Sequence, residues 1–477
     1  MIWRGFFNRA ASAPAQEALV FGDVRLTYGA LATAAEELGR SLPGGDQAGP
    51  RRVLLRHRKP AVLLQRVLAC WSRGFVPVVL REGTTEAQIL EFRDRLAPAA
   101  ILIDDEALGG VEHRSTGKFS ASTHGAAEFQ PRDEALILAT SGSTGAPKFV
   151  ALPAESVCLT ASTIIGQLGF CSDDRIAVTT PLGYAYGLMG ASVPGLLAGA
   201  TLILAPPGEP PIRTHALIRG ERITVVQGPP SMFRLLLAYW RSEPFDSVRL
   251  VTTGGESLPR GLTDALHRAF PSARKVFLYG MTEAGPRVAH EAFENGGGCE
   301  GCVGRPFAHF DWRLEGVPGA AAGEGRLLLR GPSLFLGYVA ANGSYEGLDA
   351  EGFFATNDLL ATLPDGRLAF RGRLDRVFKS GGRLVNPAAV EALLRRHPDV
   401  ADAACFPEEH EWLGLVPVAE ILLRPGASLD EGVLLDFCRL HAEPHCVPRR
   451  IAQVAEWTLN DSGKRRTRAV LPPGSGQ

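Results

Sequence analysis

Short hydrophobic runs alternate with longer amphipathic segments along most of the chain. The runs are bounded by turn residues and occupy positions 99–104, 135–139, 175–180, 200–205, 223–227 and 249–253. Between them, apolar residues recur with helical spacing at positions 28–42, 85–96, 154–168 and 231–241. Short buried strands that alternate with helices are typical of a largely parallel sheet. The pattern therefore predicts an α/β fold.

The pattern changes in the last third of the chain. After residue 301, segments such as 324–331 (EGRLLLRG) and 365–373 (DGRLAFRGR) predict short strands joined by glycine turns. From residue 387 onward, helices are predicted at 388–397 and 430–441, around one strand at 418–424. This change predicts a domain boundary between residues 370 and 385.

The stretch from 176 to 208 carries no charged residue and resembles a membrane span in that respect. However, Pro181, Pro194, Pro206 and Pro207 interrupt it, and it lacks an unbroken run of about 20 strongly apolar residues. We expect a buried strand, loop, helix and strand here.

Composition narrows the class of protein further. Of 477 residues, 45% are apolar and 21% are charged, a balance typical of a folded globular chain. Fifty basic residues against 51 acidic ones leave a net charge of −1, so no overall field favours nucleic acid or an acidic membrane. Eight scattered cysteines do not suggest a disulfide scaffold, and the first residues lack the apolar core of a signal peptide. We therefore expect a cytoplasmic protein.

The sharpest chemical signal is the segment 140–148, Thr-Ser-Gly-Ser-Thr-Gly-Ala-Pro-Lys, which follows an apolar strand. Glycines let backbone N–H groups approach an anion, hydroxyls add donors, and Lys148 adds positive charge. These are the requirements of a polyphosphate site, although the spacing differs from that of a Walker A loop. Taken alone, the segment is also compatible with an ordinary polar hairpin turn.

Further motifs follow in order along the chain. Residues 279–285 read Tyr-Gly-Met-Thr-Glu-Ala-Gly, residues 356–358 read Thr-Asn-Asp, residues 372–376 read Gly-Arg-Leu-Asp-Arg, and residues 462–464 read Ser-Gly-Lys. Together with Lys379-Ser-Gly-Gly, this series resembles the adenylate-forming superfamily, which includes acyl- and aryl-CoA ligases, luciferases and adenylation domains. The resemblance covers the whole chain, including residues 18–31, 73–78 and 330–338.

The resemblance implies an activity with ATP, Mg²⁺ and a small carboxylic acid. It implies a phosphate loop made by Thr140, Ser141, Gly142, Ser143, Thr144, Gly145 and Lys148. Other nucleotide-binding positions would be Gly255, Glu256, Tyr279, Gly280, Met281, Asp358 and Arg373, the last two at the ribose. Thr282 would contact the α-phosphate, Glu283 with Thr144 would ligate Mg²⁺, and Lys464 would be catalytic, bridging the substrate carboxylate and the α-phosphate.

The same resemblance implies an acid pocket, a pivot and an acceptor side. The pocket would be lined by Tyr184, Tyr186, Met189, Gln227, Gly228, Ser231 and Gly254. The pivot would be Asp375, and Lys379, Gly381 and Gly382 would face the acceptor. The implied fold is a large N-terminal domain of layered α/β subdomains with a small β-barrel, residues 1–374, and a small mobile C-terminal α/β domain, residues 375–477.

The sequence departs from the family pattern at Phe149, Asn357 and Arg465, where glycine, glycine and an aliphatic residue are usual. None of these changes removes a charged catalytic group. Because no acid occurs between residues 176 and 208, an α-amino acid substrate is disfavoured. Two tyrosines and a methionine suit an aryl or medium-length acyl group.

Alternatives remain at this stage. No carrier-protein segment occurs in the 477 residues, so the acceptor would be CoA or the phosphopantetheine of a separate carrier. A stand-alone enzyme that loads such a carrier, and a nucleotide-binding pseudoenzyme, are the competing interpretations. Metal binding is disfavoured at Cys299 and Cys302, which lack a second pair, and at Cys438, His441, His445 and Cys446, where core or surface placement is favoured.

Overall fold

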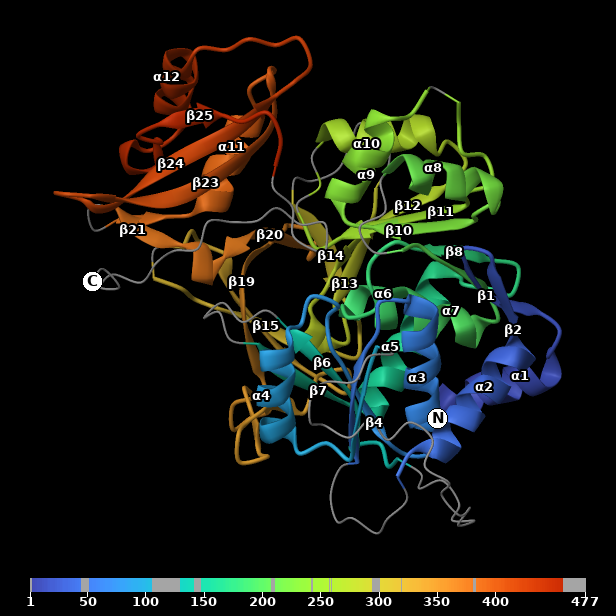
Figure 1. Ribbon diagram of the computed structural model, residues 1–477. Coiled ribbons are helices and arrows are strands. Elements are labelled where there is room, and N and C mark those ends of the chain that lie inside the picture. Colours follow the sequence, from blue (N-terminus) through green and yellow to red (C-terminus); the bar gives the residue numbers. More distant parts are fainter. Residues whose placement is uncertain are drawn as a thin grey trace. The chain divides into compact units, whose positions relative to one another are not determined.

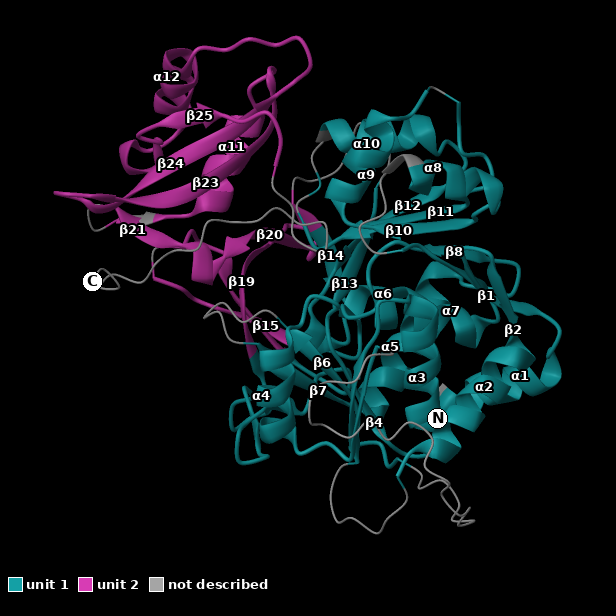
Figure 2. Cartoon of the chain, viewed as in Figure 1, with its two compact units in different colours: residues 1–298, 303–311, 330–354 teal, residues 299–302, 312–329, 355–477 magenta. Residues whose placement is uncertain are grey.

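The chain folds into two compact units (Figures 1 and 2). The computed structural model describes residues 2–43, 51–104, 129–140, 147–206, 211–241, 243–256, 258, 260–293, 301–318, 320–380 and 383–457. Unit 1 comprises residues 1–298, 303–311 and 330–354, and unit 2 comprises residues 299–302, 312–329 and 355–477. The mixed α/β class expected from the pattern is confirmed.

The first sheet of unit 1 has a parallel centre. Its strands are, in spatial order, β14 (Cys302–Pro306), β13 (Ala289–Ala292), β12 (Arg274–Tyr279), β11 (Leu250–Gly254), β10 (Val225–Gly228), β8 (Arg175–Val178), β9 (Thr201–Leu204), β1 (Glu17–Phe21) and β2 (Val24–Thr27). Strands β12, β11, β10, β8, β9 and β1 are parallel neighbours, whereas β13, β14 and β2 are added antiparallel. The predicted parallel sheet is therefore confirmed.

Helices α8 (Pro211–Gly220), α9 (Pro230–Ala238) and α10 (Arg260–Ala269) cover one face of this sheet (Figure 1). Phe233 and Leu266 from these helices pack with Val226 and Val251 from the strands in one buried cluster. Side chains of neighbouring residues in a strand alternate between faces. Gln227 and Thr252 therefore point to the opposite face.

The second sheet of unit 1 has the order β18 (Tyr345–Glu346), β17 (Gly337–Val339), β7 (Lys148–Pro153), β6 (Glu134–Thr140), β4 (Val76–Val79), β3 (Arg52–Arg56) and β5 (Ala100–Ile103). The described residues among the first hundred of unit 1 also form four helices. They are α1 (Ile2–Ser12), α2 (Tyr28–Ser41), α3 (Pro60–Ser72) and α4 (Glu86–Leu96). Helix α4 begins as predicted because Thr85 and Gln88 form a reciprocal capping box.

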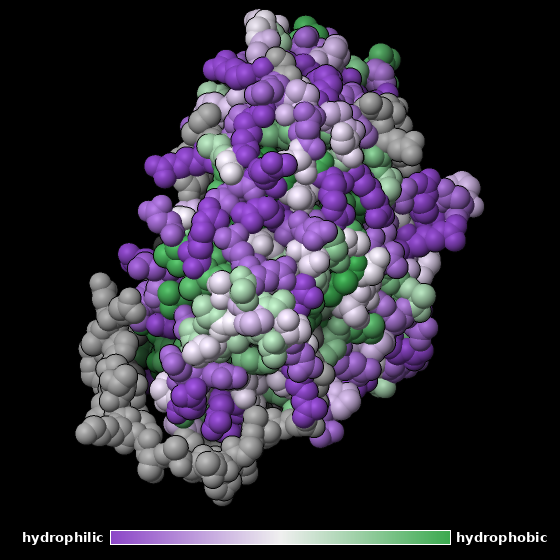
Figure 3. Space-filling model, turned by 90° about the vertical axis from the view of Figure 1, so that its right-hand side faces the viewer, coloured by the Kyte–Doolittle hydropathy of each residue, from purple (hydrophilic) through white to green (hydrophobic). Residues whose placement is uncertain are grey.

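The uncharged stretch folds as expected. Strand β8 leads through α6 (Ala185–Gly187), the π-helical segment η1 (Leu188–Ser192) and α7 (Val193–Ala198) to β9, and α5 (Ala154–Leu168) packs beside them. Among the described residues, no helix is long and apolar enough to cross a bilayer. The face of the molecule in Figure 3 carries mostly hydrophilic side chains, with hydrophobic ones gathered toward its centre.

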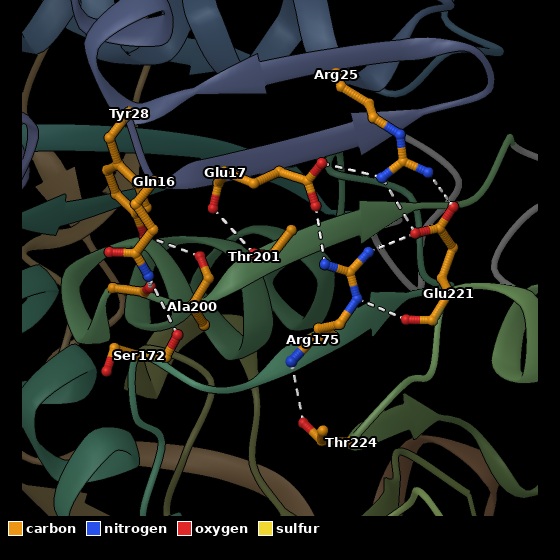
Figure 4. A network of polar contacts seen from close by, with 11 residues as sticks. Gln16, Glu17, Arg25, Tyr28, Ser172, Arg175, Ala200, Thr201, Glu221 and Thr224 are labelled. Atoms are coloured by element: carbon orange, nitrogen blue, oxygen red, sulfur yellow. Dashed lines mark hydrogen bonds and ion pairs between the residues drawn. The ribbon is translucent and has the colours of Figure 1, made fainter. Parts of the chain in front are cut away.

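Ion pairs occupy the amino-terminal edge of the parallel strands (Figure 4). Arg175 at the start of β8 donates to Glu17 on β1, at 2.8 Å, and also pairs with Glu221. Arg25 on β2 contacts the same two carboxylates, at 2.9 and 2.6 Å. In parallel sheets, ligands bind at the opposite, carboxyl edge. The candidate site is therefore sought there.

Unit 2 contains two groups of strands. The first has the order β15 (Asp311–Glu315), β16 (Glu324–Arg330), β19 (Phe354–Thr362) and β20 (Leu368–Arg373), and η3 (Leu374–Arg376) follows it. The second contains β22 (Arg383–Val385), β21 (Phe378–Ser380), β24 (Gly414–Leu423) and β23 (Val400–His410), with β25 (Ile451–Gln453) beside β24. Helices α11 (Pro387–Arg395) and α12 (Glu431–His441) and the short η4 (Pro444–Cys446) complete it.

The expectation of one strand in the C-terminal segment is wrong, because β23 and β25 join β24. Strand β23 was missed because alanines and acidic residues, which have low strand propensity, make up much of it. An antiparallel ladder to β24, from Val400 opposite Leu423 to His410 opposite Gly414, holds it in place. The expected boundary at Asp375 falls inside unit 2, because residues 355–374 pack with the C-terminal segment. The division into domains 1–374 and 375–477 stays a prediction.

Candidate functional site

The carboxyl edge of the central sheet collects many of the predicted site residues. Strand β10 ends at Gln227 and Gly228, β11 ends at Gly254, and β12 ends at Tyr279. A Cβ at Gly254 would lie 2.2 Å from the backbone oxygen of Leu278, so a larger residue does not fit between the strands there. Segments far apart in the sequence thus meet at one edge, as the parallel topology requires.

The segment after β12 places Glu283 on a short 3₁₀ turn, η2 (Thr282–Ala284). The phenol of Tyr338 donates a 2.6 Å hydrogen bond to Glu283 Oε1, and the backbone N–H of Phe335 donates to the Glu283 carbonyl at 2.8 Å. The carboxylate is therefore held by a different part of unit 1, the segment that includes strand β17. A hydrogen bond to a charged acceptor is among the stronger kinds in proteins.

Lys148 contacts the ring of the same tyrosine. It begins β7, directly opposite Thr140 at the end of β6, and the Thr140 hydroxyl donates to the Lys148 carbonyl at 3.3 Å. Its Nζ lies 4.7 Å from the centre of the Tyr338 ring, within cation–π range. Residues Ser141, Gly142, Ser143, Thr144 and Gly145, which the sequence analysis assigned to the phosphate loop, lie outside the described residues.

Tyr338 contacts two of the predicted site residues, and the sequence analysis gave it no role. Residues 330–338 contributed to the resemblance, but no role was assigned within them. The tyrosine lies beside β7 because β17 pairs with it, Tyr338 opposite Val150. A pairing between residues so distant in sequence leaves no local signal, so only the folded chain reveals that one ring contacts both Lys148 and Glu283.

Glu256 and Ser231 contact each other at the start of α9. The backbone N–H and the hydroxyl of Ser231 donate to Glu256 Oε2 and Oε1, each at 3.1 Å. A carboxylate at a helix N-terminus is stabilised by the unpaired N–H groups there. Gly255, just before Glu256, has a φ of +81°, which favours glycine. The structure thus brings together a predicted nucleotide-binding residue and a predicted pocket residue.

The residues expected to line the acid pocket come from one region of unit 1. Tyr186 on α6 lies with its hydroxyl 3.3 Å from the carbonyl of Thr252 on β11. The ring of Tyr184 lies 4.9 Å from the guanidinium of Arg81. Met189 on η1 is fully buried. Their assignment to substrate stays a prediction.

Unit 2 brings together the predicted ribose and pivot residues. Asp358 on β19 and Arg373 on β20 are direct cross-strand partners, and Arg373 Nη1 lies 3.5 Å from Asp358 Oδ1. Arg373 also forms a two-pronged contact with Asp375, from Nε at 2.9 Å and from Nη2 at 2.7 Å. Lys379 lies exposed on β21, whereas Gly381, Gly382 and Lys464 lie outside the described residues.

These side chains fit the groups that the resemblance implies. The oxygens of Glu283 are the hard ligands that Mg²⁺ prefers, and Lys148 supplies positive charge for phosphate. Asp358, largely buried with its backbone N–H bonded to the hydroxyl of Thr356, offers acceptors for a vicinal diol. Among the described residues, no cluster of three or more histidine, cysteine or acidic side chains could hold a metal by itself. Cys438 and Cys446 instead pack in the core of unit 2, and Cys302 is buried.

Comparisons with known proteins identify similar proteins over most of the chain. The family model described as AMP-binding enzyme matches residues 6–339, and the one described as AMP-binding enzyme C-terminal domain matches residues 389–464. The indoleacetate–CoA ligase of Aromatoleum aromaticum is 28% identical, and the alignment covers 96% of this chain and 95% of that protein. A protein of Mycobacterium tuberculosis named as the CoA ligase of a propanoyl group with a methyl-dioxo-octahydroindenyl substituent is 34% identical over 73% of this chain and 68% of that protein.

Solved structures show the same fold. The o-succinylbenzoate CoA synthetase of Bacillus subtilis, in complex with its acyl-adenylate intermediate, superposes with a TM-score of 0.81 at 23% identity, covering 97% of this chain and 96% of that one. The same synthetase has also been solved with ATP and a magnesium ion. The expectation drawn from the motifs is therefore confirmed: the chain belongs to the AMP-binding enzyme family, within the adenylate-forming superfamily.

Proposed function

We propose that this protein is an ATP-dependent acid–thiol ligase that converts a carboxylic acid to its acyl adenylate and then to a thioester of CoA. The observation that carries the proposal is the convergence of Lys148 and Glu283 on Tyr338, beside the carboxyl edge of the parallel sheet. One tyrosine thereby contacts both a cation that could bind phosphate and a carboxylate that could bind a metal ion. Membership of the AMP-binding enzyme family and the CoA ligase relatives support the reaction class.

Adenylation brings two anions together, so its catalysis rests on charge neutralisation and positioning. Lys148 and the hydroxyls of the loop before it would hold the β- and γ-phosphates. Thr282 would contact the α-phosphate, and Lys464 would bridge that phosphate and the attacking carboxylate. When bound at Glu283, Mg²⁺ would supply charge neutralisation for the departing pyrophosphate. The ribose hydroxyls would bind Asp358 and Arg373.

The acid would be an aryl or medium-length acyl acid. The segment that carries Tyr184, Tyr186 and Met189 contains no carboxylate that could hold a substrate ammonium group, which disfavours an α-amino acid. The relatives act on an indole acetate and on a polycyclic propanoate, both acids with ring systems. Rings of this size match a pocket lined by tyrosines.

The acceptor would be CoA, since both relatives are CoA ligases. In the second half-reaction the thiol attacks the acyl carbonyl and AMP leaves. We infer that residues 375–477 pivot about Asp375 between the two half-reactions, which would exchange Lys464 for the Lys379–Gly382 loop. Loading of a separate carrier protein is the runner-up.

A carboxylic acid panel tests the proposal. Purified protein is incubated with ATP, Mg²⁺ and single acids, and pyrophosphate release is measured before and after addition of CoA. We expect release with ring-bearing acids, weak release with α-amino acids, and acyl-CoA formation detectable by mass spectrometry. If adenylates form but CoA does not discharge them, a carrier protein is the acceptor. Binding of ATP without pyrophosphate release from any acid would contradict the enzyme assignment.

A further inference from the structure

Arg287 is a buried cation with few partners. It lies just before β13 with 4% of its surface exposed. Its Nη2 donates to the Gly190 carbonyl at 3.3 Å and its Nη1 to the Pro286 carbonyl at 3.5 Å, both long contacts. Its Nε has no hydrogen-bond partner, and among the described residues no carboxylate forms an ion pair with it. Most of the donor capacity of the guanidinium therefore faces no acceptor.

The guanidinium lies among residues expected to line the acid pocket. The Cζ atom of Arg287 is 4.8 Å from the centre of the Tyr186 ring. The Tyr186 hydroxyl donates a hydrogen bond to the Thr252 carbonyl. A Cβ at Gly190 would lie 2.9 Å from Arg287 Nη2, so the missing side chain at position 190 makes the space that the guanidinium fills. Tyr186 provides no counter-charge, because burial raises the pKa of its phenol and keeps it protonated.

A second buried polar side chain in the same region has no hydrogen-bond partner for its amide group. Gln227 is 2% exposed, and neither its Oε1 nor its Nε2 has a hydrogen-bond partner. It is the direct neighbour of Thr252 across β10 and β11, so both side chains point to the face on which Tyr186 lies. Buried amide and guanidinium groups ordinarily have hydrogen-bond partners. One buried guanidinium with an unbonded Nε and one buried amide without side-chain hydrogen bonds, in the same region of unit 1, indicate a polar group of a ligand.

Charge decides what kind of group this is. Burial lowers the pKa of Arg287 to about 10, so the side chain is still a cation at neutral pH. A buried cation is costly unless an anion compensates it, and a ketone or hydroxyl would satisfy hydrogen bonds while leaving the charge unpaired. A carboxylate matches the planar fork of a guanidinium and accepts two parallel bonds.

We propose that Arg287, assisted by Gln227, binds a second carboxylate of the acid substrate, so that the protein activates one end of a dicarboxylic acid. The inference rests on the proposed function, because it assumes that the acid occupies the region around Tyr186. The carboxylate at Arg287 stays ionised and unreacted. The other carboxylate attacks the α-phosphate.

The test compares acids that differ only at the far end. Linear and aryl diacids of graded length are each paired with the monoamide and with the isosteric branched monoacid, for example adipate, adipic acid monoamide and 6-methylheptanoate. We expect the best diacid to exceed its neutral partners in kcat/KM for pyrophosphate release by about a hundredfold or more, the scale of a buried charge pair. Equal rates across the matched acids would overturn the inference.

Variants locate the effect at Arg287. Arg287→Met should abolish the preference for the diacid while activity on the neutral acids stays the same or rises, and Arg287→Lys should restore part of it. The control is Arg132→Met, because the Arg132 side chain is 70% exposed and should leave the preference unchanged. Circular dichroism and thermal unfolding establish that each variant is folded. A folded Arg287→Met protein that still prefers the diacid would contradict the assignment.

Direct binding separates this inference from the proposed function. Isothermal titration calorimetry of the same acids, with AMP present, requires no turnover. If monoacids are activated and diacids neither bind better nor react faster, the ligase proposal stands and the inference fails. If no acid releases pyrophosphate but diacids bind the wild type and not Arg287→Met, binding of a carboxylate at Arg287 stands, whereas activation of the diacid and the ligase proposal fail.

Discussion

The phenol of Tyr338 donates a 2.6 Å hydrogen bond to the carboxylate of Glu283, a residue 55 positions earlier in the chain. The same ring lies 4.7 Å from Lys148 Nζ. One aromatic side chain thus contacts both a cation and a carboxylate of the predicted site. The hydrogen bond occupies one oxygen of Glu283, and the ring contact leaves the N–H donors of Lys148 available for phosphate.

The hydrogen bond between Tyr338 and Glu283 predicts the effect of Tyr338→Phe. The ring below Lys148 remains, but Glu283 loses the donor that orients it, and a hydrogen bond to a charged group contributes about 1.5–3 kcal/mol. We expect pyrophosphate release to fall by about tenfold or more and the half-saturating Mg²⁺ concentration to rise. A Mg²⁺ titration of the adenylation rate measures both.

Tyr338→Ala serves as the comparison, because it also removes the ring that Lys148 contacts. Its loss should exceed that of the phenylalanine variant. If Tyr338→Phe keeps both the rate and the Mg²⁺ dependence of the wild type, Tyr338 has no positioning role toward Glu283.

We expect Lys464 to be required for adenylation but not for thioester formation. If it bridges the carboxylate and the α-phosphate, Lys464→Ala lowers adenylation by about 10²–10³, the scale of one preorganised contact to developing charge. Thioester formation from purified acyl adenylate should continue, because that step would use the Lys379–Gly382 loop. Arg465→Ala is the matched control for removal of positive charge from the same segment. Equal loss of both half-reactions in a folded Lys464→Ala protein would refute the role.

Asp375→Pro tests the pivot. Proline fixes φ near −65° and restricts the residue before it, so the variant should be trapped in one arrangement. One half-reaction should stay within about tenfold of the wild type and the other should fall by about a hundredfold or more. Pyrophosphate exchange measures the first, and single-turnover thioester formation measures the second.

The contact between Asp375 and Arg373 requires its own control. Asp375→Ala removes this ion pair, formed at 2.9 and 2.7 Å, but leaves the backbone able to turn. It should slow both halves modestly and similarly, because Arg373 is then less well oriented at the ribose. If proline and alanine have the same effect, the ion pair and not the pivot explains the loss.

We expect Asp174 to make a contribution to the free energy of unfolding that decreases at acidic pH. Burial alone would raise its pKa, but hydrogen bonds from Arg249, the Cys171 N–H and Thr224 outweigh burial and lower that pKa. A lowered folded-state pKa stabilises the fold above the unfolded value of about 3.9, and this contribution is lost as pH falls through the folded-state value. Asp174→Asn should therefore lower the free energy of unfolding by about 1–3 kcal/mol at pH 7 and by less near pH 3.

Urea unfolding at the two pH values measures this difference. The control is Asp173→Asn at the exposed neighbouring position, which should change stability by less than about 0.5 kcal/mol at either pH. A destabilisation by Asp174→Asn that is the same at pH 3 and pH 7 would contradict the electrostatic explanation.

Much of the fold follows from local pattern. The helix predicted at 154–168 is α5 with the same bounds, because a helical stripe of apolar residues and the αL glycine at position 169 define it locally. Strand β23 escaped prediction because its stability comes from pairing with β24, not from its own residues. The short strands expected after residue 301 are also present. Strand β15 is one of them, and its residues alternate between exposed and half-buried positions.

The sequence by itself determined the family, the order of the motifs and the types of group that serve phosphate, metal and ribose, because each motif is a short run whose chemistry is local. The tertiary structure decided which of these groups are neighbours and which charges are compensated. Tyr338 acquires a role because β17 pairs with β7, and Arg287 stands out because no carboxylate among the described residues packs against it. Whether a charge is paired depends on what the fold places within a few ångströms of it, and the order of residues along the chain does not record that.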